Sequence, residues 1–280
     1  MNEHDKYFES NKKIWNQRTK VHRDSSFYDL EGFRKGKTVL TPIELNELGD
    51  VNGKSMLHLQ CHFGMDSLNW ARLGAKVTGI DISDEAIRVA RELNEELHLD
   101  AEFHCCNLYD LHPAHMEASG NWPLGKKAGV SFDIVFTSYG TIGWLPDLDK
   151  WAQTIAWYLR PGGIFYMAEF HPVAWMFDDE FTHIKYFYDN RELITVENYG
   201  TYTDRNAAIA GTEYSWNHSI SEVLNALLKN GLHLSHFNEF MYSPYSNFAG
   251  SVQGEDGNWR ISGMEGKIPL VYSLKAIKAG

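Results

Sequence analysis

The sequence predicts an α/β fold, in which helices cover both faces of a doubly wound, mostly parallel sheet. Short apolar runs alternate with longer amphipathic segments from residue 54 to residue 170, and glycine or proline marks many of the turns between them. The runs are rich in β-branched and aliphatic residues and read as apolar on both faces, which is typical of strands that helices cover on both sides. In such sheets a ligand binds beyond the carboxyl ends of the strands, so we expect the functional site there.

The predicted elements follow this alternation along the chain. A helix over 3–24 and a short helix over 42–48 come first, with a loop or broken helix at 25–41 between them. The predicted strands are 54–59, 76–80, 101–106, 132–137 and 164–170. The predicted helices between them are 65–73, 83–97 and 148–159, and 112–130 is a loop with room for a short helix. Residues 1–50 are thus expected to form a helical extension, or lid, ahead of a main domain over 51–280.

The pattern changes after the fifth strand. Residues 172–217 are rich in aromatic and acidic side chains and are predicted to be an insertion over one edge of the site. A helix over 219–230 and two more strands, 234–242 and 270–277, complete a seven-stranded sheet. The stretch 243–267, which is rich in Gly, Ser and Asn, is expected to loop out.

The composition is that of a globular protein and argues against several partners. Of the 280 residues, 43% are hydrophobic and 14% aromatic, and the formal net charge is -11. An acidic chain without a Lys/Arg cluster is not expected to bind nucleic acid or an anionic membrane surface. No apolar run exceeds five residues and the N-terminus carries no secretory signal, so we expect a cytoplasmic protein without a membrane segment.

The loop after the first strand carries the first recognisable motif. It reads QCHFG at 60–64, and His58 lies two residues before it. The segment resembles the first motif of class I S-adenosylmethionine-dependent methyltransferases, where an acidic residue late in the strand precedes a G-x-G-x-G turn. His58 stands at the acidic position, and Gln60 and His62 replace the first two glycines, so that Gly64 alone matches. The replacements imply either a looser approach of the backbone to the ligand or a variant site with side-chain contacts of its own.

Three later segments are similar to further motifs of the family. Asp81 ends the second strand, where a carboxylate can accept hydrogen bonds from both ribose hydroxyls of an adenosine; the alternative is that it caps the next helix, for which Ser83 is better placed. Asn107 ends the third strand, where the family often has an aspartate that contacts adenine, although a turn role is nearly as well supported. The LRPGG turn at 159–163 matches a structural element of the family, and the resemblance covers about residues 50–172.

The resemblance implies a Rossmann-like methyltransferase that binds S-adenosylmethionine and a small-molecule acceptor. The residues that it assigns to the cofactor are His58, Gln60, Cys61, His62, Gly64, Asp81, Ile82, Asn107, Leu108, Ser138 and Tyr139. Additions to the common core usually build the acceptor pocket in this family, so we expect it beside the N-terminal extension and the inserted segment. Its predicted residues are Trp15, Arg18, Tyr28, Trp144, His171 and Trp175.

The reaction that this family implies is direct displacement of the sulfonium methyl group, for which a protein mainly aligns the reactants and excludes water. An oxygen or nitrogen acceptor can also require a general base. The candidates at the right edge of the sheet are His171 and Glu169, which strand alternation puts on one face, and Tyr139. His171 could instead simply end its strand before Pro172.

Two other functions stay open on the sequence alone. The missing glycines allow a protein that binds S-adenosylmethionine or S-adenosylhomocysteine without transferring the methyl group. A nicotinamide-dependent oxidoreductase fits less well, because the first strand is not followed by a G-x-G-x-x-G loop. No metal site is expected, since His58 and His62 lie on a strand and a loop rather than on one helix. The sequence does not specify the acceptor, and a monomer and a homodimer are both compatible with it.

Overall fold

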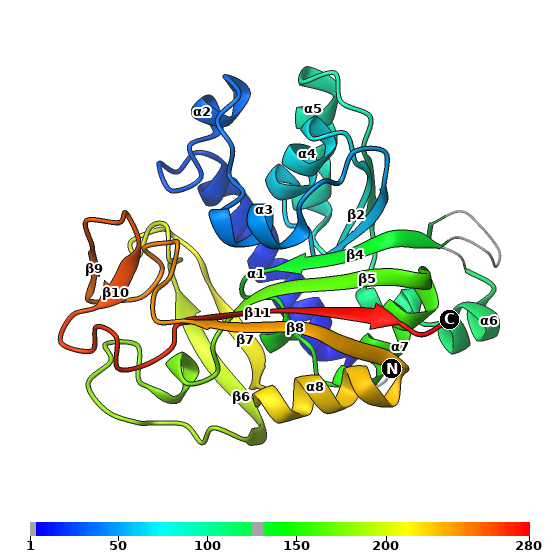
Figure 1. The fold of residues 1–280 in the computed structure, drawn as a ribbon. Helices are drawn as coiled ribbons and strands as arrows, with labels where there is room; N and C mark the ends of the chain where they lie inside the picture. The colour runs from blue at the N-terminus through cyan, green and yellow to red at the C-terminus, as the bar shows by residue number, and fades with distance from the viewer. Residues whose placement is uncertain (1–3, 122, 125–130) are drawn as a thin grey trace.

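The computed structural model describes residues 4–121, 123–124 and 131–280, and its centre is a seven-stranded sheet (Figure 1). The strands of this sheet are β1 (Ser55–Leu59), β2 (Lys76–Asp81), β3 (Glu102–Cys105), β4 (Phe132–Ser138), β5 (Leu159–Phe170), β8 (Leu232–Phe240) and β11 (Val271–Lys278). Their order is β3-β2-β1-β4-β5-β11-β8. The strands β1 to β5 pair in parallel, and β11 runs antiparallel to both of its neighbours. The prediction of a doubly wound, mostly parallel sheet is therefore confirmed.

Helices cover both faces of this sheet, as the apolar strands predict. The four that matter most are α4 (Met65–Arg72), α5 (Asp84–Glu96), α7 (Leu148–Tyr158) and α8 (Ile220–Lys229). Helices α4 and α5 lie on one face, and α7 and α8 lie on the other (Figure 1). Neighbouring residues of β1 therefore enter different cores, Met56 with Trp70 of α4 and Leu57 with Trp151 of α7. No helix in the described part of the chain is long and apolar enough to cross a membrane.

The local sequence determines where the two helices next to the site begin. Gly64 precedes α4 with a φ of 80°, a left-handed conformation that glycine adopts without steric cost. The Ser83 hydroxyl accepts a hydrogen bond from the Ala86 amide at 3.0 Å and caps α5, as predicted. Both helix N-termini consequently lie at the edge where the parallel strands end.

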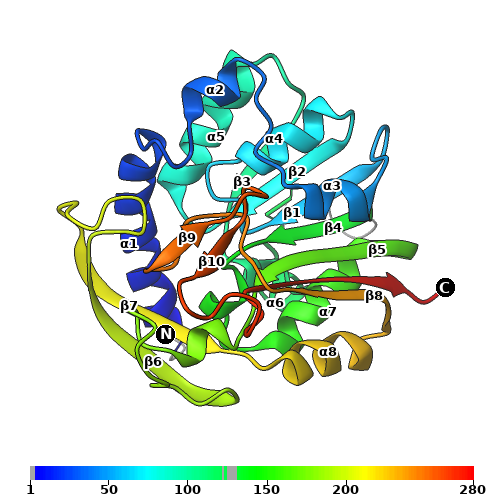
Figure 2. The same ribbon diagram turned by 60° about the vertical axis from the view of Figure 1, so that its left-hand side comes forward.

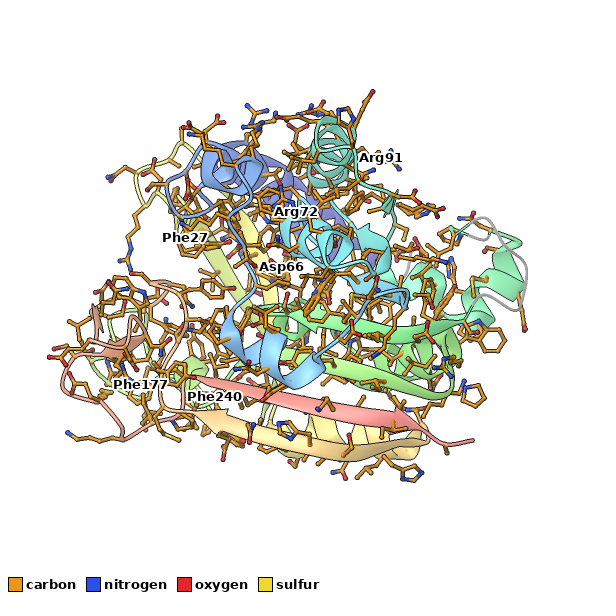
Figure 3. The ribbon with its side chains drawn as sticks, turned by 45° about the horizontal axis from the view of Figure 1, so that its top comes forward. Phe27, Asp66, Arg72, Arg91, Phe177 and Phe240 are labelled. Atoms are coloured by element: carbon orange, nitrogen blue, oxygen red, sulfur yellow. The ribbon has the colours of Figure 1, made fainter. Side chains whose placement is uncertain are left out.

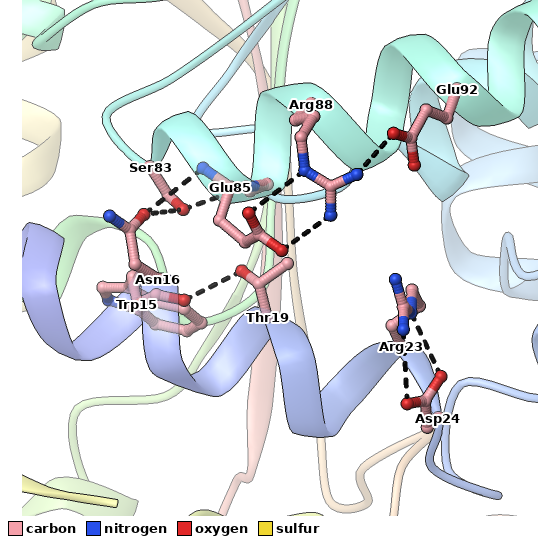
Figure 4. A network of polar contacts seen from close by, with 10 residues as sticks. Trp15, Asn16, Thr19, Arg23, Asp24, Ser83, Glu85, Arg88 and Glu92 are labelled. Atoms are coloured by element: carbon pink, nitrogen blue, oxygen red, sulfur yellow. Dashed lines mark hydrogen bonds and ion pairs between the residues drawn. The ribbon is translucent and has the colours of Figure 1, made fainter.

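The N-terminal region is helical, as predicted, and it joins two distant parts of the fold. Its helices are α1 (Asp5–Arg23), α2 (Leu30–Arg34) and α3 (Pro42–Leu48), and α1 contacts the antiparallel strand pair β6 (Asn190–Tyr199) and β7 (Ala210–Asn217). Figure 2 shows α1 between α5 and this pair. Toward α5, the Asn16 side chain accepts a hydrogen bond from Ser83 Oγ at 2.6 Å (Figure 4). Toward β7, the Asn11 amide bonds the carbonyl and the N–H of Tyr214 at 2.8 and 3.0 Å.

Two stretches are more regular than the sequence predicts. The insertion 172–217 contains the β6–β7 pair, and 243–267 contains a second pair, β9 (Ser251–Gln253) and β10 (Trp259–Ile261). The prediction of a plain loop over 243–267 was wrong, and Asp256-Gly257 is the hairpin signal that it overlooked.

Shorter helices occupy several connections between the larger elements. These are η1 (Leu108–Leu111), α6 (Pro113–Ser119), η2 (Ile142–Trp144) and η3 (Ala174–Met176). The predicted loop 112–130 allows for a short helix, and α6 is that helix. Of the residues that suggest this loop, Gly125 and Gly129 lie outside the described part of the chain, and so does the first residue of the predicted helix 3–24.

Candidate active site

A cavity of about 1160 Å³ lies where the parallel strands end. Its strand-end half is lined by residues 58–66, 80–82, 106–108 and 138–145, which follow or end β1, β2, β3 and β4. Its outer half is lined by α1 and by residues from 27–42, 170–217 and 244–258. All eleven residues predicted for the cofactor line this one cavity. Of the six predicted for the acceptor pocket, Trp15, Arg18, Tyr28, Trp144 and Trp175 line it, and His171 does not.

The loop after β1 has the backbone of a glycine-rich turn although two of the glycines are replaced. Gln60, His62 and Gly64 have φ angles of 54°, 51° and 80°, all in the left-handed region. That conformation costs an L-residue with a side chain about 1–2 kcal/mol. At Gly64 a Cβ atom would also come within 2.8 Å of Phe103 and 2.9 Å of Ala90. The packing of the loop against its neighbours therefore requires Gly64, independently of any ligand.

The side chains of Gln60 and His62 connect this loop to other parts of the site. The Gln60 amide donates a hydrogen bond to the Thr141 carbonyl, 2.9 Å away on the loop after β4. The His62 ring lies 5.3 Å from the ring of Trp15 and 5.5 Å from that of Tyr28, so it supports α1 and the chain that follows it. Two buried atoms, Gln60 Oε1 and His62 Nε2, have no hydrogen-bond partner among the described residues. They are polar positions that a ligand could satisfy.

Asp81 is held by the backbone on both sides of the β2 end. Its carboxylate accepts hydrogen bonds from the His62 amide at 2.9 Å and from the Ser83 amide at 2.8 Å. Burial raises the pKa of this carboxyl to about 6. Each carboxylate oxygen has accepted one N–H and keeps a second lone pair, so the group can still accept bonds from two hydroxyls of a ligand.

Two further polar side chains of the cavity wall, His58 and Asp66, each contact a serine hydroxyl. Burial lowers the pKa of His58 to about 3, so its imidazole is neutral, and its Nδ1 lies 2.7 Å from Ser67 Oγ. Asp66, on the first turn of α4, accepts a hydrogen bond from Ser138 Oγ at 2.8 Å, and burial raises the pKa of its carboxyl to about 6 (Figure 3). Sequence reasoning missed Asp66, because an acidic residue in the first turn of a helix normally reflects the helix dipole.

The remaining predicted cofactor residues have local roles as well. The Asn107 carboxamide oxygen accepts a hydrogen bond from the Tyr109 amide at 3.1 Å, which is the turn role left open by the sequence. Burial raises the pKa of the Cys61 thiol well above its usual value, so this residue behaves as a small apolar group. Ile82 and Leu108 supply apolar surface of the wall. No group of three or more metal-ligating side chains is present among the described residues.

Two of the three candidate bases lie away from the cavity. Glu169 is 2% exposed, and its carboxylate accepts hydrogen bonds from the amides of Gly140, Thr141 at 2.7 Å and Ile142 at 3.2 Å. His171 is 3% exposed, and its Nε2 lies 2.9 Å from Glu239 Oε1. Neither residue lines the cavity. The acceptor-pocket position predicted for His171 was therefore wrong, and both side chains instead hold the chain beyond the end of the sheet.

Tyr139 and Trp144 do lie in the cavity wall, on the loop after β4. The Tyr139 ring is 5.1 Å from the ring of Tyr245, its hydroxyl is 3.4 Å from Thr41 Oγ1, and burial raises the pKa of the phenol. The Trp144 indole donates a hydrogen bond to the Gly140 carbonyl at 2.7 Å. This bond fixes the orientation of the indole where the strand-end half and the outer half of the cavity meet.

The outer half rests on a buried ion pair and a set of aromatic rings. Arg18 on α1 and Glu213 on β7 are 6% and 8% exposed, with Nη2 and Oε1 2.5 Å apart. The Arg18 guanidinium lies 5.1 Å from the ring of Trp15. The Tyr28 and Tyr202 hydroxyls are 2.5 Å apart and join the segment after α1 to the β6–β7 connection. The outer half is therefore assembled from segments far apart in sequence.

Comparison with known proteins places the chain among methyltransferases. A family model described as a methyltransferase domain matches residues 50–224. A ubiquinone biosynthesis O-methyltransferase from Xanthomonas oryzae is 29% identical over 145 residues, which are 51% of this chain and 55% of that protein. One from Albidiferax ferrireducens is 30% identical over 140 residues, 49% of this chain and 50% of that protein. The chain thus spans about half the length of the curated relatives that it matches.

Solved structures share the fold at low sequence identity. A putative S-adenosylmethionine-dependent methyltransferase from Listeria monocytogenes has a TM-score of 0.58 at 18% identity, with 85% of this chain and 98% of that chain covered. An S-adenosylmethionine-dependent methyltransferase from Mesorhizobium loti has a TM-score of 0.58 at 20% identity, with 85% and 96% covered. These similarities show the common fold.

Proposed function

The chain belongs to the methyltransferase-domain family, and we propose that it transfers a methyl group from S-adenosylmethionine to a small-molecule acceptor. One observation carries the proposal. Eleven residues that the resemblance assigns to the cofactor come from four separate strand ends, and all of them line one cavity. That cavity lies where doubly wound sheets bind their ligands.

The chain's own residues suit the nucleoside and the amino-acid part of this cofactor. Asp81 offers two acceptors for ribose hydroxyls, and Asn107 and Leu108 form the neighbouring wall for the adenine. The left-handed backbone at 60–64 keeps the course of a glycine-rich turn. The unpartnered atoms Gln60 Oε1 and His62 Nε2 offer further polar contacts to the amino-acid part.

When bound, S-adenosylmethionine supplies a methyl group that its sulfonium has already activated. The protein then has to hold an acceptor in line with the methyl group and exclude water. Trp15 and Trp144, whose ring centroids are 5.4 Å apart, close the cavity where its two halves meet. Their faces can also lie against a positive charge. Of the three candidate bases, Tyr139 is the one with a surface on the cavity. Burial keeps its phenol protonated, so it can orient an acceptor through a hydrogen bond but does not take the proton of the acceptor.

Calorimetric titration tests the proposal directly. S-adenosylmethionine and S-adenosylhomocysteine should bind the protein, and NAD should not. Asp81→Ala should weaken both affinities by about 1–3 kcal/mol, the range for a hydrogen bond to a charged group, whereas Asp81→Asn should lose less. Asp100→Ala, at an exposed aspartate away from the cavity, is the matched control. Affinity for S-adenosylhomocysteine that is unchanged in Asp81→Ala would contradict the placement of the ribose.

Turnover separates a transferase from a silent binder. S-adenosylhomocysteine formation is measured with a panel of small amines, phenols and carboxylic acids as acceptors. Formation that depends on an acceptor supports transferase activity. Tight binding of the cofactor without turnover on any class of acceptor would favour the binding protein.

A further inference from the structure

We propose that the methyl acceptor is a compact molecule with an ammonium group, and that the Asp66 carboxylate is the partner of this positive charge. A protonated nitrogen has no lone pair, so the ammonium group serves for recognition, and the methyl group goes to another atom of the acceptor or to this nitrogen after it has lost its proton. The inference rests on the proposed function and names the substrate class of the same cavity. Three observations carry it: the single hydrogen bond to the Asp66 carboxylate, the excess of negative charge in the cavity wall, and a row of aromatic side chains that lines the same cavity.

The Asp66 carboxylate has few hydrogen-bond donors for its burial. Within the described part of the chain, it accepts one hydrogen bond, from Ser138 Oγ at 2.8 Å. Asp81, by comparison, accepts two backbone amides. A partly buried carboxylate with one hydroxyl donor is incompletely compensated for its lost hydration, and burial accordingly raises its pKa. A cation in the cavity would supply the missing compensation.

The charged side chains of the cavity wall cannot supply this cation themselves. Eight carboxylates and three basic side chains line the cavity. The three basic side chains already have carboxylate partners: Arg18 with Glu213 at 2.5 Å, Lys37 with Asp29 at 2.8 Å and Arg205 with Glu180 at 3.3 Å. His58 and His62 are neutral, because burial lowers both pKa values. Arg260, outside the cavity lining, pairs with a fourth carboxylate, Asp256, at 2.7 Å. Among the described ion pairs, the other four carboxylates of the wall have no Arg or Lys partner, and this excess of negative charge favours a cationic ligand in addition to the sulfonium.

A row of aromatic rings lines the same cavity as Asp66. Tyr28, Phe27, Tyr245 and Tyr139 form a continuous row, with centroid distances of 5.1, 6.0 and 5.1 Å between successive rings. All four line the cavity, and Asp66 and Phe27 are labelled in Figure 3. Tyr139 directly follows Ser138, whose hydroxyl donates to the Asp66 carboxylate, and the ring of Tyr28 lies 4.8 Å from that of Phe63, three residues before Asp66. The two ends of the row therefore lie beside the two segments that hold this carboxylate.

Aromatic faces combined with a carboxylate are the chemistry that recognises an ammonium group. Each face attracts a nearby cation through the quadrupole of the ring, and the carboxylate adds a charged hydrogen bond. A phenolate or carboxylate acceptor would instead meet the like charge of Asp66. The same wall therefore selects for an amine and against an anionic acceptor.

Three probes of one size and different charge test this inference. Phenethylamine is cationic, 2-phenylethanol is neutral and phenylacetate is anionic at pH 7. Their binding to the full chain saturated with S-adenosylhomocysteine is measured by calorimetry in the wild type, in Asp66→Asn and in Asp179→Asn. Asp179 is an exposed carboxylate that lines the same cavity, so its variant is the matched control for a general loss of negative charge.

We expect phenethylamine to bind the wild type about tenfold more tightly than 2-phenylethanol, and phenylacetate to bind least. The preference should disappear in Asp66→Asn and persist in Asp179→Asn. Equal binding of the three probes to the wild type, or binding of none of them, overturns the inference without the need for any variant. A preference for the amine that survives in Asp66→Asn overturns the assignment to Asp66.

The affinity for S-adenosylhomocysteine distinguishes the two possible sources of the ammonium group. The cofactor product carries an ammonium group of its own. If Asp66 binds the acceptor, Asp66→Asn keeps the wild-type affinity for S-adenosylhomocysteine; a tenfold or greater loss assigns the carboxylate to the cofactor and overturns our proposal. A wild-type protein that binds neither S-adenosylhomocysteine nor S-adenosylmethionine refutes the proposed function itself, which is a separate outcome.

Discussion

The two halves of the cavity are built in opposite ways. The strand-end half consists of four loops, each of which directly follows a strand of the parallel sheet, so its residues are brought together by the pairing of β1 with β2 and β4. The outer half depends on contacts across the whole chain, such as the hydrogen bonds between Asn11 and Tyr214, which are 203 positions apart. The sheet therefore determines where a ligand can bind, and a few long-range contacts determine the shape of the space beside it.

The largest expected effect is on the contact that holds the outer half together. Glu213→Ala leaves the Arg18 guanidinium buried without its carboxylate, and breaking such a pair costs about 3–5 kcal/mol. The free energy of unfolding from urea titrations should fall by that amount. Glu180→Ala removes the exposed partner of Arg205 and should cost about 0–1 kcal/mol. Similar losses in the two variants would show that α1 is not held to β7 by the Arg18–Glu213 pair.

The next effect separates two carboxyls of the cavity wall from one outside it by pH. Burial raises the pKa of Glu44, on α3 and outside the cavity lining, from 4.5 to about 8, and the pKa values of Asp66 and Asp81 from 3.8 to about 6. Each folded-state pKa lies above its unfolded value, so the folded state binds more protons in between. The stabilisation is complete below the unfolded pKa and is lost as the pH rises through the folded one.

Glu44→Gln should therefore remove the decrease in stability between pH 6 and pH 8, which we expect to be roughly 2–4 kcal/mol. Asp66→Asn should flatten only the part between about pH 4 and pH 6. The free energy of unfolding is measured at several pH values from 4 to 9 for both variants and the wild type. A wild-type decrease above pH 6 that Glu44→Gln leaves intact would contradict the role of this carboxyl.

The strand-end half could be predicted from the sequence because its determinants are local. A strand, a turn and the next helix occupy about ten residues, so Asp81 and Ser83 can be placed from their neighbours alone. Strand alternation was less informative for Glu169 and His171. Strand alternation predicts that the two side chains share a face of the sheet, but it does not predict which residues cover that face. The backbone amides of residues 140–142 donate hydrogen bonds to the Glu169 carboxylate, and the Glu239 carboxylate pairs with His171.

Five of the six residues predicted for the acceptor pocket line the cavity, but the contacts that assemble the outer half could not be predicted because they are non-local. The residues that join α1 to β7, such as Arg18 and Glu213, are far apart in the chain, and neither carries a motif. Asp66 was not predicted as a site residue for a different reason. An acidic residue at the start of a helix is already explained locally, by the dipole of α4. The structure distinguishes Asp66 because its carboxylate contacts the loop after β4 through Ser138.

The smallest expected effect concerns the two replaced glycines. Gln60→Gly removes the cost of a left-handed φ, about 1–2 kcal/mol, and loses a hydrogen bond to the Thr141 carbonyl that is worth about 1 kcal/mol. The two changes nearly cancel, so the free energy of unfolding should change by less than about 1 kcal/mol. Affinity for S-adenosylhomocysteine should fall by about 1 kcal/mol, because the variant lacks the Gln60 Oε1 atom that can accept a hydrogen bond from the cofactor. Urea titration and calorimetry measure the two quantities.

His62→Gly is the informative partner of this variant, because the two positions share a backbone conformation and differ in what their side chains contact. The His62 ring reaches across to Trp15 and Tyr28 of the outer half, so its removal should cost more stability than the relaxed φ returns. The net loss should exceed that of Gln60→Gly by about 1 kcal/mol or more, the scale of a lost aromatic contact. Equal effects at the two positions would mean that His62 acts within the loop alone, and the loop would then play no part in holding α1 over the cavity.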